Sequence, residues 1–252
     1  MLGLMLLPLL LLRSSLALNN GLARTPPMGY NTWYDWGGGH RLNETSILAT
    51  AHALVSTGLR DAGYRSLNFD DGFIAPKNKS SLLPDPGGRL PNGSLYANPV
   101  KFPRGFAALS RDITRLGLQF GVYTARGRLT CCGLAGSLGH EAEDMRRFAV
   151  DWNASYVKAD SCHGVPSDPP GSKPGTAAIW QYGNMSDGLN RTGRRVILDA
   201  CWDACWPPAS CLAAGLPPLM DERRHVANSW RIGPDGVSWG RRSVIFVFRL
   251  II

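Results

Sequence analysis

Short apolar runs alternate with amphipathic segments along most of the chain, and this pattern predicts strands and helices in turn. The apolar runs that predict strands lie at 27–33, 64–69, 118–123, 156–157, 195–200 and 226–232. Between them, apolar residues recur at helical spacing over 44–59, 104–116, 141–152 and 177–189. Strands that alternate with helices predict βαβ units, and hence a parallel sheet in an α/β protein.

Two architectures fit this alternation, a (β/α)8 barrel and an open doubly wound sheet. No Gly-x-Gly-x-x-Gly follows the first predicted strand, which disfavours a dinucleotide-binding sheet. Polar and charged residues follow strand after strand, as they do at the carboxyl ends of barrel strands. The pattern therefore favours the barrel. Residues 74–103 are rich in Pro, Gly, Asn and Ser and predict a long surface excursion.

The fourth predicted strand is followed by the charged pair Lys158 and Asp160. These residues are two apart, so on an extended chain both side chains point to the same face. Charged groups at the end of an apolar strand are costly to bury unless they pair or take part in chemistry. We therefore interpret Asp160 as a candidate catalytic nucleophile. The alternative is a strand-end aspartate that caps the next turn.

Composition indicates one folded domain and no nucleic-acid partner. The chain has 252 residues, of which 44% are hydrophobic and 18% charged, as in ordinary globular proteins. Its net charge is +8, but the basic residues are scattered and no nucleic-acid-binding motif accompanies them. The charge therefore indicates a solvated basic surface.

The first 17 residues predict a secretion signal. Residues 1–12 are a nearly pure Leu run, which Arg13 ends and which is too short to span a bilayer. Small residues before Ala17 favour cleavage after that residue over the alternative of a membrane anchor. We expect a chain that is secreted or delivered to a vacuole or lysosome, with no membrane partner.

Cysteines and glycosylation sequons agree with export. Six cysteines are present, an even number: Cys131, Cys132, Cys162, Cys201, Cys205 and Cys211. Sequons begin at Asn43, Asn78, Asn92, Asn153, Asn184 and Asn190. Disulfides are the default for such cysteines in an oxidising compartment. Zinc is the alternative, but no Cys-x-x-Cys pair with matching His spacing is present.

Several ordered motifs carry a family resemblance. They are Thr25-Pro-Pro-Met-Gly-Tyr-Asn-Thr-Trp33, Asn68-Phe-Asp-Asp-Gly-Phe73, Gly121-Val-Tyr123, Gly136-Ser-Leu-Gly-His-Glu141, Lys158-Ala-Asp-Ser-Cys162, and Trp230-Arg231 with Asp235. Through them the chain resembles glycoside hydrolase family 27, the α-galactosidase and α-N-acetylgalactosaminidase family. The motifs run in family order from about residue 22 to 240.

The resemblance implies a (β/α)8 barrel and a retaining mechanism that releases terminal α-linked galactose. Asp160 matches the family nucleophile and Asp235 the general acid/base. A retaining glycosidase needs two such carboxyl groups roughly 5–5.5 Å apart. Without the resemblance, Asp235 reads as a turn residue in Gly-Pro-Asp-Gly. Carboxylates alone carry this chemistry, so we expect neither a metal nor an organic cofactor.

The same resemblance implies a set of substrate-binding residues. Asp70 and Asp71 match paired aspartates that bind sugar hydroxyls, although the pair also fits the start of a turn. Lys158 and Arg231 resemble the substrate-binding cations of the family, and both can hold neighbouring carboxylates ionised.

Aromatic residues and one disulfide complete the implied site. Trp33 and Tyr123 would line the sugar pocket; otherwise they read as core or rim aromatics. Cys131 and Cys162 occupy the positions of a family disulfide that links the loops after strands three and four.

The segment after the fifth strand departs from the family pattern. There the chain has Cys201-Trp-Asp-Ala-Cys-Trp206, which fits neither a galactoside nor an N-acetylgalactosaminide pattern cleanly. Asp203 could take the hydrogen-bonding role, which favours galactosides. Ala125 stands near the place of a family Asp, and Ala227 near the place of the usual partner of Cys201.

The end of the chain departs further. Resemblance stops near residue 240, so 18–240 is expected to form a barrel truncated after about strand six, without the small C-terminal antiparallel β domain of the family. Residues 241–252 form an atypical apolar tail, in which a further strand is one alternative. A non-catalytic sugar-binding protein and an inactive truncated family member therefore remain alternatives, and a homodimer is left open.

Overall fold

The computed structural model describes residues 20–33, 41–76, 87–163, 176–201, 225–231 and 248–250. For Arg231 and 248–250 only the backbone is described. No helix within these ranges is both long and apolar enough to cross a membrane.

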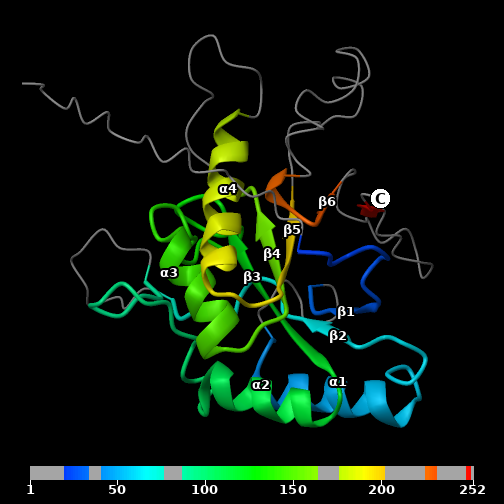
Figure 1. Ribbon diagram of the computed structural model, residues 1–252. Helices are drawn as coiled ribbons and strands as arrows, with labels where there is room; N and C mark the ends of the chain where they lie inside the picture. Colours follow the sequence, from blue (N-terminus) through cyan, green and yellow to red (C-terminus); the bar gives the residue numbers. More distant parts are fainter. Residues whose placement is uncertain are drawn as a thin grey trace, which may run out of the picture.

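Seven strands form one sheet in the order β1-β2-β3-β4-β5-β6-β7 (Figure 1). The strands are β1 (Gly29–Asn31), β2 (Ser66–Asn68), β3 (Gln119–Ala125), β4 (Tyr156–Asp160), β5 (Ile197–Ala200), β6 (Ser229–Arg231) and β7 (Phe248–Leu250). Pairing is parallel from β1 to β6, whereas β7 runs antiparallel to β6.

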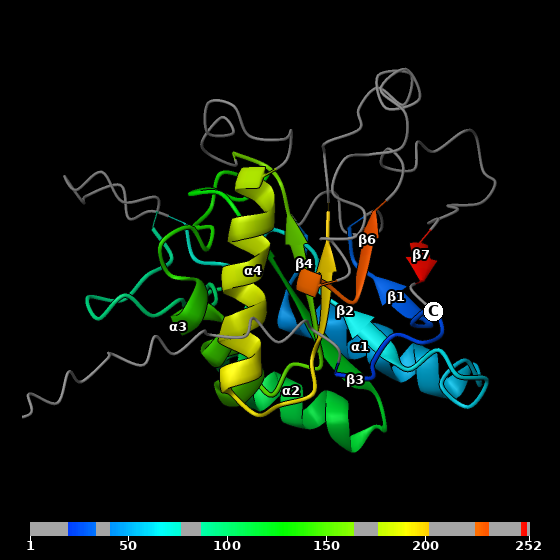
Figure 2. The same cartoon turned by 45° about the horizontal axis from the view of Figure 1, so that its top comes forward.

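Strand order decides between the two predicted architectures. A doubly wound sheet reverses its strand order at a switch point, and ligands bind there. Here each strand pairs with the next one in the sequence, without reversal. The connecting helices lie together on one side of the sheet, as the two views agree (Figure 2). The arrangement is the wall of a (β/α) barrel, as predicted, with six parallel strands.

The helices match the predicted segments closely. They are α1 (Glu44–Ser56), α2 (Gly105–Arg115), α3 (Glu141–Arg146), the π-helix η1 (Arg147–Asp151) and α4 (Thr176–Arg191). The Asn43 side chain accepts a hydrogen bond from the backbone of Ser46 and so caps α1. The helix predicted over 141–152 is α-helical only in its first half. Strand β4 also continues through Asp160 instead of ending at Val157.

Aromatic side chains fill the space between the sheet and α2. Phe69, Phe106 and Phe120 pack with ring centroids 5.0–5.4 Å apart. Trp152, which follows η1, packs against Phe106 at 5.0 Å. Because Phe69 follows β2 and Phe120 belongs to β3, this cluster helps to hold the carboxyl end of β2 against β3 and α2.

The predicted surface excursion is partly wrong. Within the described part of 74–103, Leu95 and Phe102 are fully buried. Arg89 explains how the segment packs back onto the barrel: its guanidinium binds both carboxylate oxygens of Asp144 on α3, at 2.8 and 2.7 Å. Both side chains of this pair are buried.

The start of the described chain lies beside its last parallel strands. Asn20 donates a hydrogen bond to the carbonyl of Val196, immediately before β5. Its side-chain oxygen accepts a hydrogen bond from Asn228, immediately before β6. Residues 208 positions apart therefore meet at the amino ends of these strands.

Candidate active site

Strand register brings the predicted site residues into one layer. In the parallel ladder, Tyr123 of β3 pairs with Lys158 of β4, and Lys158 pairs with Asp199 of β5. Paired residues of neighbouring strands point to the same face of a sheet. Asp160 lies two positions beyond Lys158, on the same face at the carboxyl end of β4.

Lys158 joins the carboxylates of two strands. Its ammonium lies 2.7 Å from Asp70 Oδ2 and 3.9 Å from Asp160 Oδ2, with the ring of Tyr123 5.2 Å away. Burial lowers the pKa of Lys158, but the nearby carboxylates of Asp70 and Asp160 outweigh it and leave that pKa raised. The lysine is therefore charged at neutral pH and holds the two carboxylates together.

Hydrogen bonds to both carboxylate oxygens and to the backbone fix Asp70. Besides Lys158, its Oδ2 accepts a hydrogen bond from Asn31 Nδ2 at 2.8 Å. Its own backbone N–H donates to Thr32 Oγ1, and its Oδ1 accepts from the backbone of Asp71. The carboxylate, which follows β2, is thus fixed by side chains of β1 and β4.

Asp71 supports a loop. Its Oδ2 accepts a hydrogen bond from the backbone N–H of Cys132 at 2.8 Å, and its Oδ1 accepts from that of Gly72. Burial raises the pKa of Asp71, and these backbone bonds offset only part of the rise. Asp71 thereby positions the loop that carries Cys131 and Cys132, a contact that the sequence did not reveal.

Hydrogen bonds to both carboxylate oxygens orient Asp160. Oδ2 accepts a hydrogen bond from the Tyr123 hydroxyl at 3.1 Å, and Oδ1 accepts from the Ser161 backbone N–H at 2.8 Å. Burial, with the negative charges of Asp160, Asp71 and Asp70, raises the pKa of Tyr123. The tyrosine therefore keeps its proton and stays a hydrogen-bond donor to Asp160.

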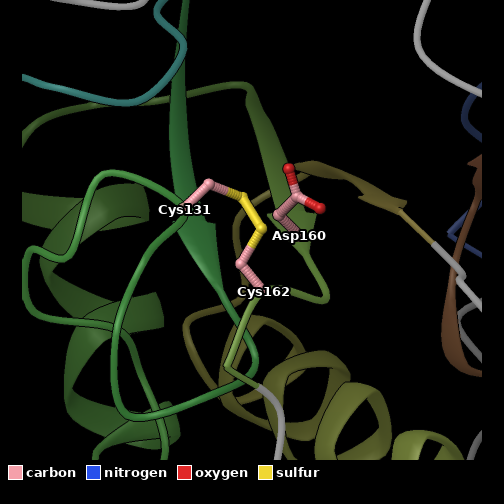
Figure 3. Close-up of side chains that lie close together, drawn as sticks. All are labelled: Cys131, Asp160 and Cys162. Carbon is pink, nitrogen blue, oxygen red and sulfur yellow. A yellow bond between two sulfur atoms is a disulfide. The ribbon is translucent and has the colours of Figure 1, made fainter.

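A disulfide lies beside Asp160 (Figure 3). It joins Cys131, in the loop after β3, to Cys162, two residues after the end of β4, as the family resemblance implies. The Tyr123 hydroxyl lies 3.0 Å from Cys131 Sγ. Cys201 makes no disulfide with any described residue.

Sequence reasoning missed two residues of this layer, Asn31 and Asp199. Asp199 is buried and accepts hydrogen bonds from Tyr156 and Ser229, both at 2.7 Å. Burial raises its pKa, although these two bonds and Lys158 oppose the rise. An aspartate inside the apolar fifth strand was the available signal for this residue.

For four predicted site residues, the described structure does not test the predicted contact with the sugar. Trp33 is partly buried, and its backbone N–H donates to Asn31, which places it at the exit of β1. Arg231 closes β6, but its side chain is not described. Asp203 and Asp235 lie outside the described residues.

Carboxylates, a lysine and a tyrosine at the carboxyl edge of a parallel barrel wall are typical of the class of (β/α) barrels, which carry their sites at that edge. Within that class, the chain belongs to the α-galactosidase family: the family model described as "Alpha galactosidase A" matches residues 25–239. A probable alpha-galactosidase of Dictyostelium discoideum is 37% identical over 219 residues, which cover 87% of this chain and 48% of that protein.

Solved structures agree with this membership. Alpha-galactosidase I from Mortierella vinacea has a TM-score of 0.67 and 36% identity, over 86% of this chain and 47% of that one. The Saccharomyces cerevisiae α-galactosidase with raffinose has a TM-score of 0.70 and 30% identity, over 89% and 43%. The chain therefore spans about half the length of the relatives it matches.

Proposed function

We propose that this chain acts as a retaining α-galactosidase with Asp160 as its nucleophile. The observation that carries the proposal is the setting of Asp160, at the carboxyl end of β4, with one oxygen bound to Tyr123 and the other to the Ser161 backbone. Lys158 lies 3.9 Å away and places a positive charge beside this carboxylate.

In the first step, a carboxylate oxygen of Asp160 attacks the anomeric carbon of the galactosyl residue, and the bond to the leaving oxygen breaks. Asp235 donates its proton to that oxygen. In the second step, Asp235 takes a proton from water, whose oxygen attacks the same carbon and releases Asp160. Two displacements retain the configuration of the sugar.

The substrates proposed are terminal α-galactosides. The raffinose complex of the yeast relative supports this class, since raffinose carries a terminal α-galactosyl group. Asp70 and Lys158, fixed to each other at 2.7 Å, offer an acceptor and a donor to adjacent sugar hydroxyls. Asp71, Trp33, Asp203 and Arg231 are proposed as further sugar contacts.

We also propose passage through the secretory pathway. The Cys131–Cys162 disulfide supports this location, because such bonds persist in oxidising compartments.

The test compares hydrolysis of an aryl α-galactoside and an aryl N-acetyl-α-galactosaminide by the full chain and by Asp160→Asn. We expect the galactoside to be preferred. The substitution should lower kcat by at least about 10⁴-fold, the scale seen when a nucleophile is removed, while circular dichroism stays unchanged.

A chemical rescue separates a nucleophile from a structural aspartate. In Asp160→Gly, added azide can attack the anomeric carbon in place of the carboxylate, and the product should be a galactosyl azide of inverted configuration. Galactose binding without turnover in the unmodified chain would instead support the sugar-binding alternative. Turnover that survives Asp160→Asn would refute the assignment.

A further inference from the structure

Three side chains beside Tyr123 form a cluster of metal-ligating types. The sulfurs of Cys131 and Cys162 and a carboxylate oxygen of Asp160 all lie within 4.8 Å of one another. Figure 3 shows the disulfide turned toward the Asp160 carboxylate. While the disulfide is intact, its sulfurs are poor ligands, because the thiolate is the form that binds metals.

The segments that carry these ligands are held independently of the disulfide. Asp71 binds the backbone of Cys132, next to Cys131. The backbone N–H of Arg126 donates to the carbonyl of Asp160 at 2.8 Å, and that of Ser137 to Ala125 at 2.9 Å. Opening the disulfide therefore leaves the three ligands close together.

We propose that reduction of Cys131–Cys162 turns this cluster into a site for one soft divalent cation, Zn²⁺ or Cd²⁺, bound by both sulfurs and Asp160. Neither cysteine is buried, so a small dithiol can reach the bond. The dithiol gives two electrons and two protons to the disulfide and becomes a disulfide itself. The cation then displaces one proton from each thiol.

The geometry suits such an ion. Two sulfurs on one tetrahedral Zn²⁺ lie about 3.8 Å apart, given bonds of about 2.3 Å. The Cα atoms are 5.0 Å apart, so side-chain rotation alone can open the sulfurs to that separation. Thiolates select soft cations such as Zn²⁺ over Mg²⁺ or Ca²⁺.

The surroundings also favour a cation. The Tyr123 hydroxyl lies 3.0 Å from Cys131 Sγ and 3.1 Å from Asp160 Oδ2, so it can donate to a bound ligand and orient it. Two new thiolates would add negative charge beside Asp160, whose ion-pair partner among the described residues is Lys158, 3.9 Å away. A divalent ion offsets that charge.

Occupancy would disable the proposed nucleophile, because the ion takes an Asp160 oxygen. This consequence rests on the proposed function, whereas metal binding does not. A reduced chain would then be held inactive by the metal. A small disulfide such as oxidised glutathione, which takes up the two electrons and becomes two thiols, would restore Cys131–Cys162, release the cation and free Asp160.

The experiment measures protection of each cysteine from alkylation in the reduced full chain. The protein is treated with dithiothreitol, exchanged into buffer with increasing Cd²⁺ and pulsed with iodoacetamide. Mass spectrometry of peptide fragment ions then assigns alkylation to Cys131 or to the adjacent Cys132. We expect Cys131 and Cys162 to become protected together, at the same Cd²⁺ concentration, while Cys132 keeps its alkylation rate. Mass spectrometry separates these from the other cysteines.

Asp160→Asn tests the third ligand, with Asp187→Asn, on the exposed face of α4, as the matched control. Loss of a metal contact should raise the Cd²⁺ concentration that protects half of Cys131 and Cys162 from alkylation, by at least about 10-fold. The control should leave this concentration unchanged. An unchanged value in Asp160→Asn, or protection of Cys131 with Cys132 in place of Cys162, would overturn the proposal. The readout needs no turnover, so an inactive chain still gives a result.

Discussion

Lys158 is the residue that links the carboxylates of the candidate site. Its ammonium is the partner of Asp70 at 2.7 Å and approaches Asp160 at 3.9 Å. Asp70 is almost completely buried, so its charge depends on Lys158 and Asn31 for compensation.

Lys158→Met should therefore destabilise the protein. Breaking a buried ion pair costs about 3–5 kcal/mol. We expect less here, about 2–3 kcal/mol, because one fifth of the Lys158 side chain is exposed and solvent screens its charge. Urea unfolding measures the change. Arg115→Met is the matched control, since Arg115 is three-quarters exposed and should change stability by less than about 0.5 kcal/mol. Equal effects would contradict the assigned pairing.

Asp199 should give stability a particular pH dependence. Burial raises its folded-state pKa above the ordinary value of 3.8, so the folded protein keeps this proton to a higher pH than the unfolded chain does. The resulting stabilisation is fully present below pH 3.8 and is lost as pH rises through the raised pKa. The wild type should therefore lose stability relative to Asp199→Asn over that interval, as chemical unfolding at several pH values would measure.

Asp61 serves as a control, because its contribution to stability should depend on pH in the opposite direction. Its hydrogen bond to Arg60 lowers its pKa, so its contribution is present above pH 3.8 and is lost as pH falls. The effect should be small, because Asp61 is exposed. A wild-type and Asp199→Asn difference that stays constant with pH would contradict the raised pKa.

At the scale of single residues, the sequence located charged residues that end an apolar run and missed Asp199, which lies inside one. Lys158, Asp160 and Asp70 stand out because charge follows an apolar run. Asp199 lies within such a run, and its partners Tyr156 and Ser229 come from two other strands. Only register shows that these three side chains meet.

Among the elements, the Arg89–Asp144 pair attaches the segment after residue 87 to α3. The guanidinium also donates to the carbonyls of Gly93 and Gly136, both at 2.8 Å. One side chain thus joins three segments, the last of which leads into α3.

Arg89→Met should cost about 3–5 kcal/mol, because it leaves Asp144 buried without its cation. Burial already raises the pKa of Asp144 against the influence of Arg89, so its charge is costly in this place. Thermal and urea unfolding measure the loss. The double variant Arg89→Met with Asp144→Leu should recover part of it, since no uncompensated charge remains. A double variant less stable than the single one would contradict this account.

Helical spacing predicted the helices well, since amphipathic patterns depend on neighbouring positions. It could not predict η1, a single π-helical turn, because an apolar stripe over 141–152 does not specify which backbone groups pair. It also misjudged the segment before α2. Composition marks that segment as polar, whereas Leu95 and Phe102 pack in the core.

For the whole molecule, alternating strands and helices predicted the parallel barrel wall, and the strand order confirms it. In the described sheet, β1 is one edge strand and β7 the other. An edge strand presents unpaired backbone groups that can bind another chain.

We therefore expect the full chain to self-associate as its concentration rises from micromolar toward millimolar. Sedimentation velocity over a dilution series measures this association, with circular dichroism as a check that the sheet persists. A chain that sediments as a monomer throughout would show that these edges are covered.

The contact of Asn20 with Val196 and Asn228 has a consequence for synthesis. Each strand from β2 to β6 pairs with one already made, so a chain emerging from the ribosome could add strands to the sheet one at a time. Asn20 is an exception: it is translated before every strand, yet its partners appear only with β5 and β6. The two hydrogen bonds of Asn20 must therefore form late, and a chain stalled before Val196 would lack both.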